Sequence, residues 1–227
     1  MKIPMKISRA HLLLPLLFLL SATCVAQDNK KFTYGLLLDN TGSMRSQFDT
    51  VREIGKSIVN QIHDHGPVSL FDFHSEGVGS ASRAIPILRI DATSDQDTLD
   101  RGIDQLYVEG GQTSLLDAVK FIADSIGNQA GDAVKIIILV TDGEDRVSDI
   151  QRQTLLKTLK DHGIKVFSVG LVEELDSQHV IIRSGGRKGA IDLLNSLAKE
   201  TGGRAIFPKG KKIDMASLLT ELAIPIH

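Results

Sequence analysis

Short apolar runs alternate with amphipathic segments along most of the chain. Three nearly continuous apolar runs, each bounded by turn residues, occupy residues 32–38, 133–140 and 164–171. Runs of this length without an apolar–polar alternation are typical of strands covered on both faces, as in a parallel sheet. Three further strands are predicted at residues 68–73, 85–90 and 204–207. Pro86 places one of them at an edge of the sheet, because proline has no N–H group to donate to a neighbouring strand.

Between these runs, apolar residues recur with a period near 3.6, which is typical of helices with one buried face. Such helices are predicted at residues 48–62, 115–126, 148–159, 191–198 and 218–222. Ser114 with Asp117, and Ser148 with Gln151, have the spacing of capping boxes at two helix starts. The alternation of strands and helices predicts a doubly wound α/β fold, with a mostly parallel central sheet, helices on both faces and one antiparallel edge strand.

The start of the chain predicts a secretory signal peptide. A positively charged stretch precedes an apolar run of nine residues at 12–20, whereas about 20 apolar residues are needed to span a bilayer. We place the cleavage after Ala26, which gives a signal peptide at residues 1–26, a short segment at 27–31 and one domain at 32–224. The predicted location is therefore secreted or periplasmic.

An alternative interpretation makes Cys24 a lipid-modified N-terminus. The residues before Cys24 match a bacterial lipobox only loosely, since Thr23 is a poor neighbour for such a cysteine and Leu20 lies one position too far away. We therefore favour cleavage after Ala26 over a lipid anchor.

The composition excludes several classes of protein. Cys24 is the only cysteine, so disulfide scaffolds, thiolate zinc sites and iron–sulfur clusters are excluded. The signal peptide carries three of the 26 basic residues and none of the 28 acidic residues, so the remaining chain has a net charge of −5. We predict no nucleic-acid partner, because such proteins usually carry a clustered basic excess. No amphipathic helix or basic tail predicts membrane insertion after signal cleavage.

Side chains with oxygen donors follow the predicted strands directly. Residues 39–44 (DNTGSM) come after the first strand, residues 141–145 (TDGED) follow the strand at 133–140, and residues 110–114 (GGQTS) precede a helix. In doubly wound sheets, functional groups gather beyond the carboxyl ends of the strands. Carboxylates and hydroxyls without thiols or imidazoles favour Mg²⁺, Mn²⁺ or Ca²⁺ over zinc or copper.

These motifs resemble the metal-ion-dependent adhesion site of von Willebrand factor type A (vWA) domains. Their sequences are also similar to those of a secreted bacterial subgroup of that family. The family signature is DxSxS, then Thr, then Asp. The matching residues are Asp39, Thr41, Ser43, Thr113 and Asp142, with Thr41 where serine is more usual. The resemblance covers residues 32–224 and implies the same doubly wound α/β fold.

The resemblance also implies a role for each of these five residues. The hydroxyls of Thr41 and Ser43 would contact Mg²⁺, and Thr113 would bind it directly in a ligand-engaged state. Asp39 and Asp142 would hold metal-bound waters, and Mn²⁺ or Ca²⁺ are alternative ions. An Asp or Glu carboxylate of a protein partner can then complete the near-octahedral coordination that Mg²⁺ requires. The resemblance thus implies an exported adhesion module.

Two other functions are weighed against this hypothesis. A Mg²⁺-dependent phosphatase of the haloacid-dehalogenase type also has an Asp after its first strand. Its chemistry needs a second Asp two residues later as a general acid, and the hydroxyl of Thr41 cannot act as one. The sequence contains no Gly-x-Ser-x-Gly, His-Glu-x-x-His or P-loop motif, so we predict that the protein is not an enzyme. A structural envelope module would be indicated by missing metal ligands.

Other polar residues are interpreted as surface or loop positions. Glu144 and Asp145 are predicted to lie on a solvated rim, and His74 on the surface near it. Loops are predicted at residues 63–65 (HDH), at 184–189 (SGGRKG), and at 91–100 (DATSDQDTLD), where the loop leads into a helix.

Overall fold

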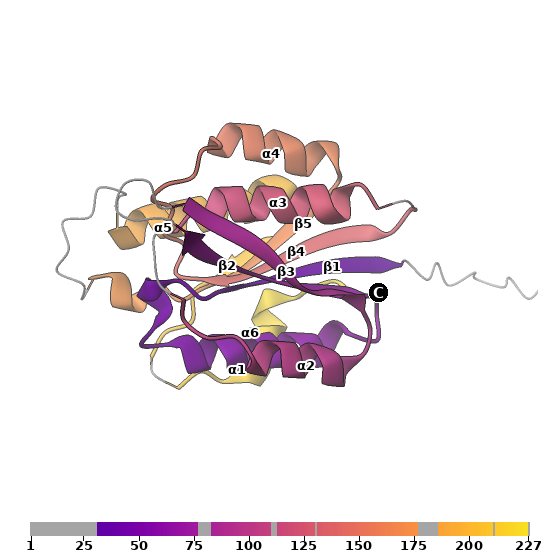
Figure 1. The fold of residues 1–227 in the computed structure, drawn as a ribbon, viewed down its shortest axis with the longest axis horizontal. Helices are drawn as coiled ribbons and strands as arrows, with labels where there is room; N and C mark the ends of the chain where they lie inside the picture. Colours follow the sequence, from indigo (N-terminus) through magenta and orange to yellow (C-terminus); the bar gives the residue numbers. More distant parts are fainter. Residues whose placement is uncertain are drawn as a thin grey trace, which may run out of the picture.

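A six-stranded sheet lies between two layers of helices (Figure 1). The computed structural model describes residues 31–76, 83–109, 113–129, 131–176, 186–210 and 212–226. The strand order is β3-β2-β1-β4-β5-β6, with β3 antiparallel to β2 and every other neighbouring pair parallel. This confirms the predicted doubly wound sheet with one antiparallel edge strand. The predicted signal peptide, Cys24 and residues 27–30 lie outside the described residues.

The predicted strands and helices all form, with changes at their ends. The strands are β1 (Phe32–Asp39), β2 (Val68–Glu76), β3 (Arg83–Thr93), β4 (Val134–Thr141), β5 (Lys165–Gly170) and β6 (Arg204–Ile206). The helices are α1 (Phe48–Ile62), α2 (Gln96–Asp104), α3 (Leu115–Gly127), α4 (Arg152–Asp161), α5 (Gly186–Thr201) and α6 (Met215–Leu222). The short 3-10 helices η1 (Gly42–Met44) and η3 (Glu173–Asp176) follow β1 and β5.

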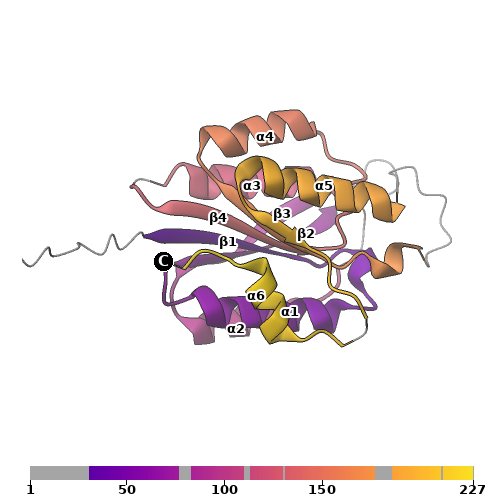
Figure 2. The ribbon, with the colours of Figure 1, turned by 180° about the vertical axis from the view of Figure 1, so that it is seen from behind.

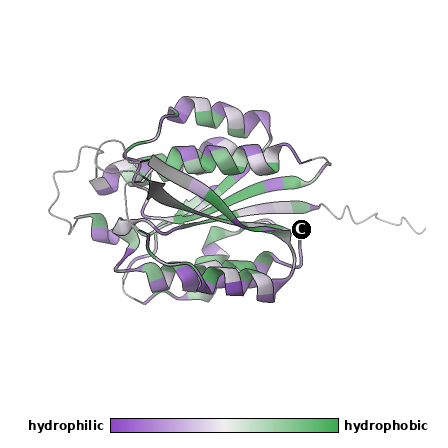
Figure 3. Ribbon diagram, viewed as in Figure 1, coloured by the Kyte–Doolittle hydropathy of each residue, from purple (hydrophilic) through white to green (hydrophobic). Residues whose placement is uncertain are grey.

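Helices cover both faces of the sheet, which explains why its strands read as continuous apolar runs. Helices α3, α4 and α5 lie on one face, and α1, α2 and α6 lie on the other (Figures 1 and 2). Along β1, Leu36 and Leu38 pack into the cluster with α1, whereas Leu37 packs into the cluster with α3. The helices turn their hydrophobic sides toward the sheet (Figure 3). Both faces of β1 are therefore buried, as expected for a central parallel strand.

Two predicted loops differ from the structure. Residues 91–93 belong to β3, because this strand continues its pairing with β2 as far as Thr93 opposite Val68. Asp95 then caps α2, since its side chain accepts hydrogen bonds from two backbone N–H groups at the start of that helix. Residues 186–189, predicted as a loop, form the first turn of α5. No helix in the described parts of the chain is long and apolar enough to span a bilayer.

Two successive glycines follow α5, and a different physical constraint favours glycine at each position. Gly202 has a φ of 76°, the left-handed conformation common at helix ends, and a Cβ there would meet no atom within 4 Å. A Cβ on Gly203 would instead lie 1.9 Å from the carbonyl oxygen of Val166 in β5. The pairing of β5 with β6 therefore requires a residue without a side chain at position 203.

We expect Gly203→Ala to lower the free energy of unfolding by about 2–3 kcal/mol, because the backbone of β5 must move to admit the methyl group. Gly202→Ala is the matched control and should cost about 1 kcal/mol, from backbone strain alone. Urea unfolding followed by circular dichroism measures both values. Equal losses in the two variants would contradict the close approach to Val166.

Candidate functional site

The segment after β1 folds back around the carboxylate of Asp39. The backbone N–H and the hydroxyl of Thr41 both donate to Asp39 Oδ1, at 3.0 and 2.7 Å. The hydroxyls of Thr41 and Ser43 lie 3.2 Å apart. Asp39 and Thr41 are fully buried. Three of the five predicted metal-binding residues are therefore in contact within one loop.

A residue that the sequence analysis missed fixes the second oxygen of Asp39. Thr141, the last residue of β4, donates from its hydroxyl to Asp39 Oδ2 at 2.6 Å and accepts from Gly143 N at 3.0 Å. Because β1 and β4 are parallel neighbours, their carboxyl ends meet at this edge. Both oxygens of Asp39 are thus held by protein donors, which fix the orientation of its carboxylate.

Thr113 joins the same group of side chains. Its hydroxyl lies 3.4 Å from that of Thr41. Its carbonyl oxygen accepts hydrogen bonds from Arg146 N at 2.8 Å and Val147 N at 3.3 Å. Thr113 is therefore held between the loop after β1 and the loop after β4. The preceding residues 110–112 lie outside the described part of the chain.

The start of α3 is capped by the loop after β4 and not by its own residues. Asp145 Oδ1 accepts from Leu116 N, and Ser148 Oγ accepts from Asp117 N, both at 3.2 Å. Ser114 makes no capping bond with its side chain, and α4 begins only at Arg152. Both predicted capping boxes are therefore wrong, because Asp117 and Ser148 bond across the two segments and not within one helix. Asp145 is a half-buried capping residue, so its predicted place on a solvated rim is also wrong.

Asp142 and Glu144 provide carboxylate oxygens that lack partners. Asp142 Oδ1 accepts from Glu144 N at 2.9 Å, whereas Asp142 Oδ2 is buried without a hydrogen bond. Glu144 is only 3% exposed, so the predicted solvated rim is wrong for this residue as well. One of its oxygens pairs with Arg146, and Glu144 Oε1 has no partner. The only sequence signal for Glu144 is its place two residues after Asp142.

Burial makes the negative charge of this edge unfavourable. It raises the pKa of Asp39 to about 7, and the charge of Asp142 adds to this effect against the hydrogen bonds from Thr141 and Thr41. Burial likewise raises the pKa of Asp142, although the Ser43 hydroxyl, Glu144 N and Arg146 oppose it. It also raises the pKa of Glu144, with a further contribution from Asp142. Three buried carboxyl groups therefore lie at this edge, and Arg146 offsets the charge of Asp142 and Glu144 alone. A cation or protons would relieve their repulsion.

A comparison with family models identifies the fold as that of a known family. The model of the von Willebrand factor type A domain matches residues 35–209, more than half of the chain. The chain belongs to this family. No curated protein matches its sequence.

Several solved structures of bacterial proteins share this fold. BatB from Bacteroides thetaiotaomicron has a TM-score of 0.62 at 17% identity, over 85% of this chain and 97% of that one. An aerotolerance-related membrane protein from Bacteroides fragilis has a TM-score of 0.60 at 19% identity, over 84% and 98%. The pilus adhesin SpaC from Lactobacillus rhamnosus GG has a TM-score of 0.60 at 14% identity, over 81% of this chain and 28% of the adhesin. At these identities, the likeness concerns the fold alone.

The other candidate segments of this vWA domain show no cluster of metal-ligating side chains where they are described. Residues 63–65 form a turn after α1, as predicted, and His65 Nε2 lies 3.2 Å from Asp64 Oδ1. Among the described residues, no three His, Cys, Asp or Glu side chains cluster in a way that could hold a metal ion. The site after β1 and β4 differs in that hydroxyl groups supply most of its donors. His74 belongs to β2, but its side chain lies outside the described part.

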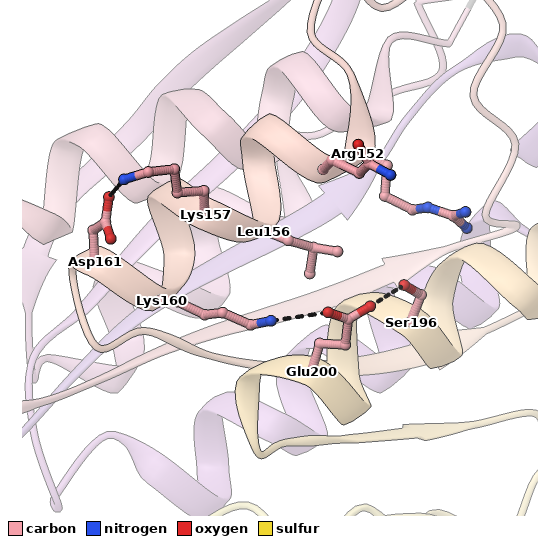
Figure 4. A pocket seen from close by; sticks show the side chains of 8 residues that line it. Arg152, Leu156, Lys157, Lys160, Asp161, Ser196 and Glu200 are labelled. Carbon is pink, nitrogen blue, oxygen red and sulfur yellow. Dashed lines mark hydrogen bonds and ion pairs between the residues drawn. The ribbon is translucent and has the colours of Figure 1, made fainter.

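A hollow between α4 and α5 of the vWA domain has about 430 Å³ of space (Figure 4). Four of its charged side chains form two ion pairs: Lys157 with Asp161 at 2.5 Å, and Lys160 with Glu200 at 2.9 Å. Ser196 also donates to Glu200 Oε1 at 3.2 Å. None of the five predicted metal-binding residues lines this hollow. It is therefore a solvated groove with internal ion pairs, separate from the candidate site.

In the metal-free vWA domain, we expect Asp39→Asn to gain stability relative to the wild type as the pH rises from about 4 to about 7. The pKa of Asp39 lies near 7 in the folded state, above the ordinary value of 3.8. The folded protein therefore retains a proton that the unfolded chain releases, and this contribution to stability is lost as the pH rises through the folded pKa. The expected gain in melting temperature is roughly 5–10 °C, measured by thermal unfolding in EDTA. A difference that stays constant over this range would contradict the raised pKa.

Proposed function

We propose that this chain is an exported vWA interaction module that binds a protein partner through Mg²⁺. The ion would be held by Asp39, Thr41, Ser43, Thr113 and Asp142, and the partner would supply an Asp or Glu carboxylate. Mn²⁺ or Ca²⁺ are alternative ions at the same residues.

The main support is the buried Asp142 Oδ2, which no donor reaches at hydrogen-bond distance, although the Ser43 hydroxyl lies close enough to act on this carboxyl group. A buried carboxylate oxygen without a donor is costly, so its retention argues for a ligand that satisfies it. The neighbouring hydroxyls of Thr41, Ser43 and Thr113 are neutral oxygen donors, which together with carboxylates form the donor set that Mg²⁺ prefers.

The proposed roles follow from how each oxygen is already used. Three protein donors occupy the two oxygens of Asp39, which favours a role in holding metal-bound water over direct contact. The hydroxyls of Thr41 and Ser43 can turn their lone pairs toward an ion. Bound Mg²⁺ would supply positive charge and an exchangeable position for the carboxylate of the partner. Glu144 Oε1, which also lacks a partner, is a further candidate to hold a metal-bound water.

Export and adhesion are supported by features outside this site. The predicted signal peptide at residues 1–26 directs the chain across a membrane. Among proteins with the same fold, one is described as a pilus adhesin and another as an aerotolerance-related membrane protein. We propose a secreted or periplasmic location with cleavage after Ala26.

Isothermal titration with Mg²⁺ and with Mn²⁺ tests the proposal on the wild type and on Asp39→Ala. Binding heats are expected for the wild type and not for the variant, because the variant loses the carboxylate around which the loop folds. Equal heats in both proteins would reject the metal site. A pull-down from the exported fraction, with and without chelator, then tests whether partner capture needs the ion.

A colorimetric phosphatase screen with Mg²⁺ separates the enzyme hypothesis from the binding one. We expect no turnover, because Thr41 stands where a general acid would be needed and its hydroxyl donates to Asp39. Turnover that Asp39→Asn abolishes would favour the phosphatase.

A further inference from the structure

A buried acidic residue on the strand next to β1 contacts the proposed metal-binding loop, which comprises residues 39–43. Asp72 of β2 pairs with Leu38 of β1 and is wholly buried. Asn40 Nδ2 donates to Asp72 Oδ2 at 3.0 Å, and Arg89 Nε donates to Asp72 Oδ1 at 2.8 Å. Both carboxylate oxygens are thus satisfied, and Arg89 supplies the counter-charge that a buried carboxylate requires.

Arg89 reaches Asp72 because β3 contains an irregularity at this position. Leu70 of β2 is opposite Ile90, and the next residue, Phe71, is opposite Leu88, so Arg89 has no residue facing it. Such a bulge re-aims the side chain of the extra residue. Its guanidinium group can therefore make a second contact, in which Arg89 Nη2 donates to Glu109 Oε1 at 2.8 Å.

Glu109 belongs to the segment that leads to Thr113. Its backbone N–H donates to the carbonyl oxygen of Asn40 at 3.1 Å, and Asn40 Nδ2 also donates to the carbonyl oxygen of Tyr107 at 3.2 Å. Asn40 stands between Asp39 and Thr41 in the chain. The described part of this segment before Thr113, residues 107–109, is therefore attached to the loop after β1 through Asn40, and to the sheet through Arg89.

We propose that the Asp72–Arg89–Glu109 bridge positions Thr113 relative to the loop that carries Thr41 and Ser43, and that it thereby sets the preference of the site for Mg²⁺. The inference rests on the proposed metal site. Thr113 is the one predicted ligand outside the segments that end β1 and β4 and the loops that follow them. Its distance from the other ligands therefore depends on what holds it, which is the loop after β4 on one side and residues 107–109 on the other. Mg²⁺ demands near-ideal octahedral geometry, whereas Ca²⁺ accepts a variable number of ligands in flexible arrangements. A loosened Thr113 segment should therefore weaken Mg²⁺ binding more than Ca²⁺ binding.

Glu109→Ala is the variant that tests the bridge, because it leaves the Asp72–Arg89 pair intact and buries no unpaired charge. Titration calorimetry should find Mg²⁺ binding weakened by at least about tenfold, as for other groups that orient metal ligands, with a smaller change for Ca²⁺. Glu109→Gln retains a hydrogen-bond acceptor for Arg89 and should recover part of the Mg²⁺ affinity. Glu200→Ala, which removes an ion-paired glutamate on α5, is the control and should bind both ions like the wild type.

A metal-free measurement accompanies the titrations. Hydrogen exchange in EDTA should be faster at residues 107–109 in Glu109→Ala and unchanged in Glu200→Ala. Unchanged exchange, wild-type affinity for Mg²⁺, or an equal loss for both ions would overturn the positioning role. If the wild type binds Mg²⁺ and Asp39→Ala does not, such a result rejects the bridge alone. If the wild type fails to bind Mg²⁺, this inference and the proposed function are both wrong.

Discussion

Asp142→Asn is expected to abolish the Mg²⁺-dependent rise in melting temperature and, at pH 8, to stabilise the metal-free protein. The asparagine oxygen can still accept from Glu144 N, and its amide group can donate to the Ser43 hydroxyl. The substitution therefore removes the charge with little change of shape. Burial raises the pKa values of Asp39 and Glu144 most, and the charge of Asp142 adds to this effect. Without that charge, the metal-free protein should gain about 1–3 kcal/mol. Mg²⁺ affinity should fall by roughly 100-fold or more.

Differential scanning fluorimetry with EDTA or with excess Mg²⁺ measures both effects in one experiment. Asp124→Asn is the control, since Asp124 lies half-exposed on α3, where its side chain pairs with Lys120. It should retain the Mg²⁺ shift of the wild type. A metal-free Asp142→Asn protein that is less stable than the wild type would mean that Asp142 serves the fold and not an ion.

The fold and the five metal-binding candidates follow from local sequence patterns. Continuous apolar runs are diagnostic here because both faces of the parallel strands are buried, as β1 illustrates. Strand ends are equally informative, because the carboxyl ends of β1 and β4 must meet at one edge once the strands are parallel neighbours. The structure brings Asp39, Thr41, Ser43 and Thr113 together there. It buries Asp142 in the loop after β4, at the same edge.

Contacts between segments that are distant in the sequence could not be predicted from local sequence patterns. Glu144 reads as a surface residue from its charge, yet it is buried because its loop folds inward beside Arg146. The caps of α3 come from Asp145 and Ser148, about 30 residues later in the chain. A capping box is defined by local spacing, so it cannot detect a cap from another loop.

The Asp72–Arg89 pair was also invisible in the sequence. Asp72 lies within a run of strand residues, and nothing local indicates that its side chain is buried. Arg89 reaches it only because the register of β3 against β2 shifts at that point. Such a shift depends on how two strands pair, which no single segment encodes.

Arg89→Met is expected to lower the free energy of unfolding by about 3 kcal/mol at pH 7, because it leaves the carboxylate of Asp72 buried without a counter-charge. Asp72→Asn in the same chain should restore about 2 kcal/mol of this loss, since a neutral amide needs no cation. The amide can also donate to Asn40 Oδ1, which is buried without a partner. The destabilisation should shrink toward pH 4, where Asp72 without its guanidinium partner becomes protonated.

Arg52→Met is a matched control for this prediction. The side chains of Arg52 and Arg89 are 34% and 33% exposed, and each pairs with an aspartate, but Asp49 on α1 is exposed where Asp72 is buried. The control should therefore cost less than about 1 kcal/mol. Urea unfolding of the two single variants and of the Asp72→Asn/Arg89→Met double variant measures these values at pH 7 and pH 4. If the double variant is no more stable than Arg89→Met alone, the loss comes from packing of the arginine side chain and not from the charge of Asp72.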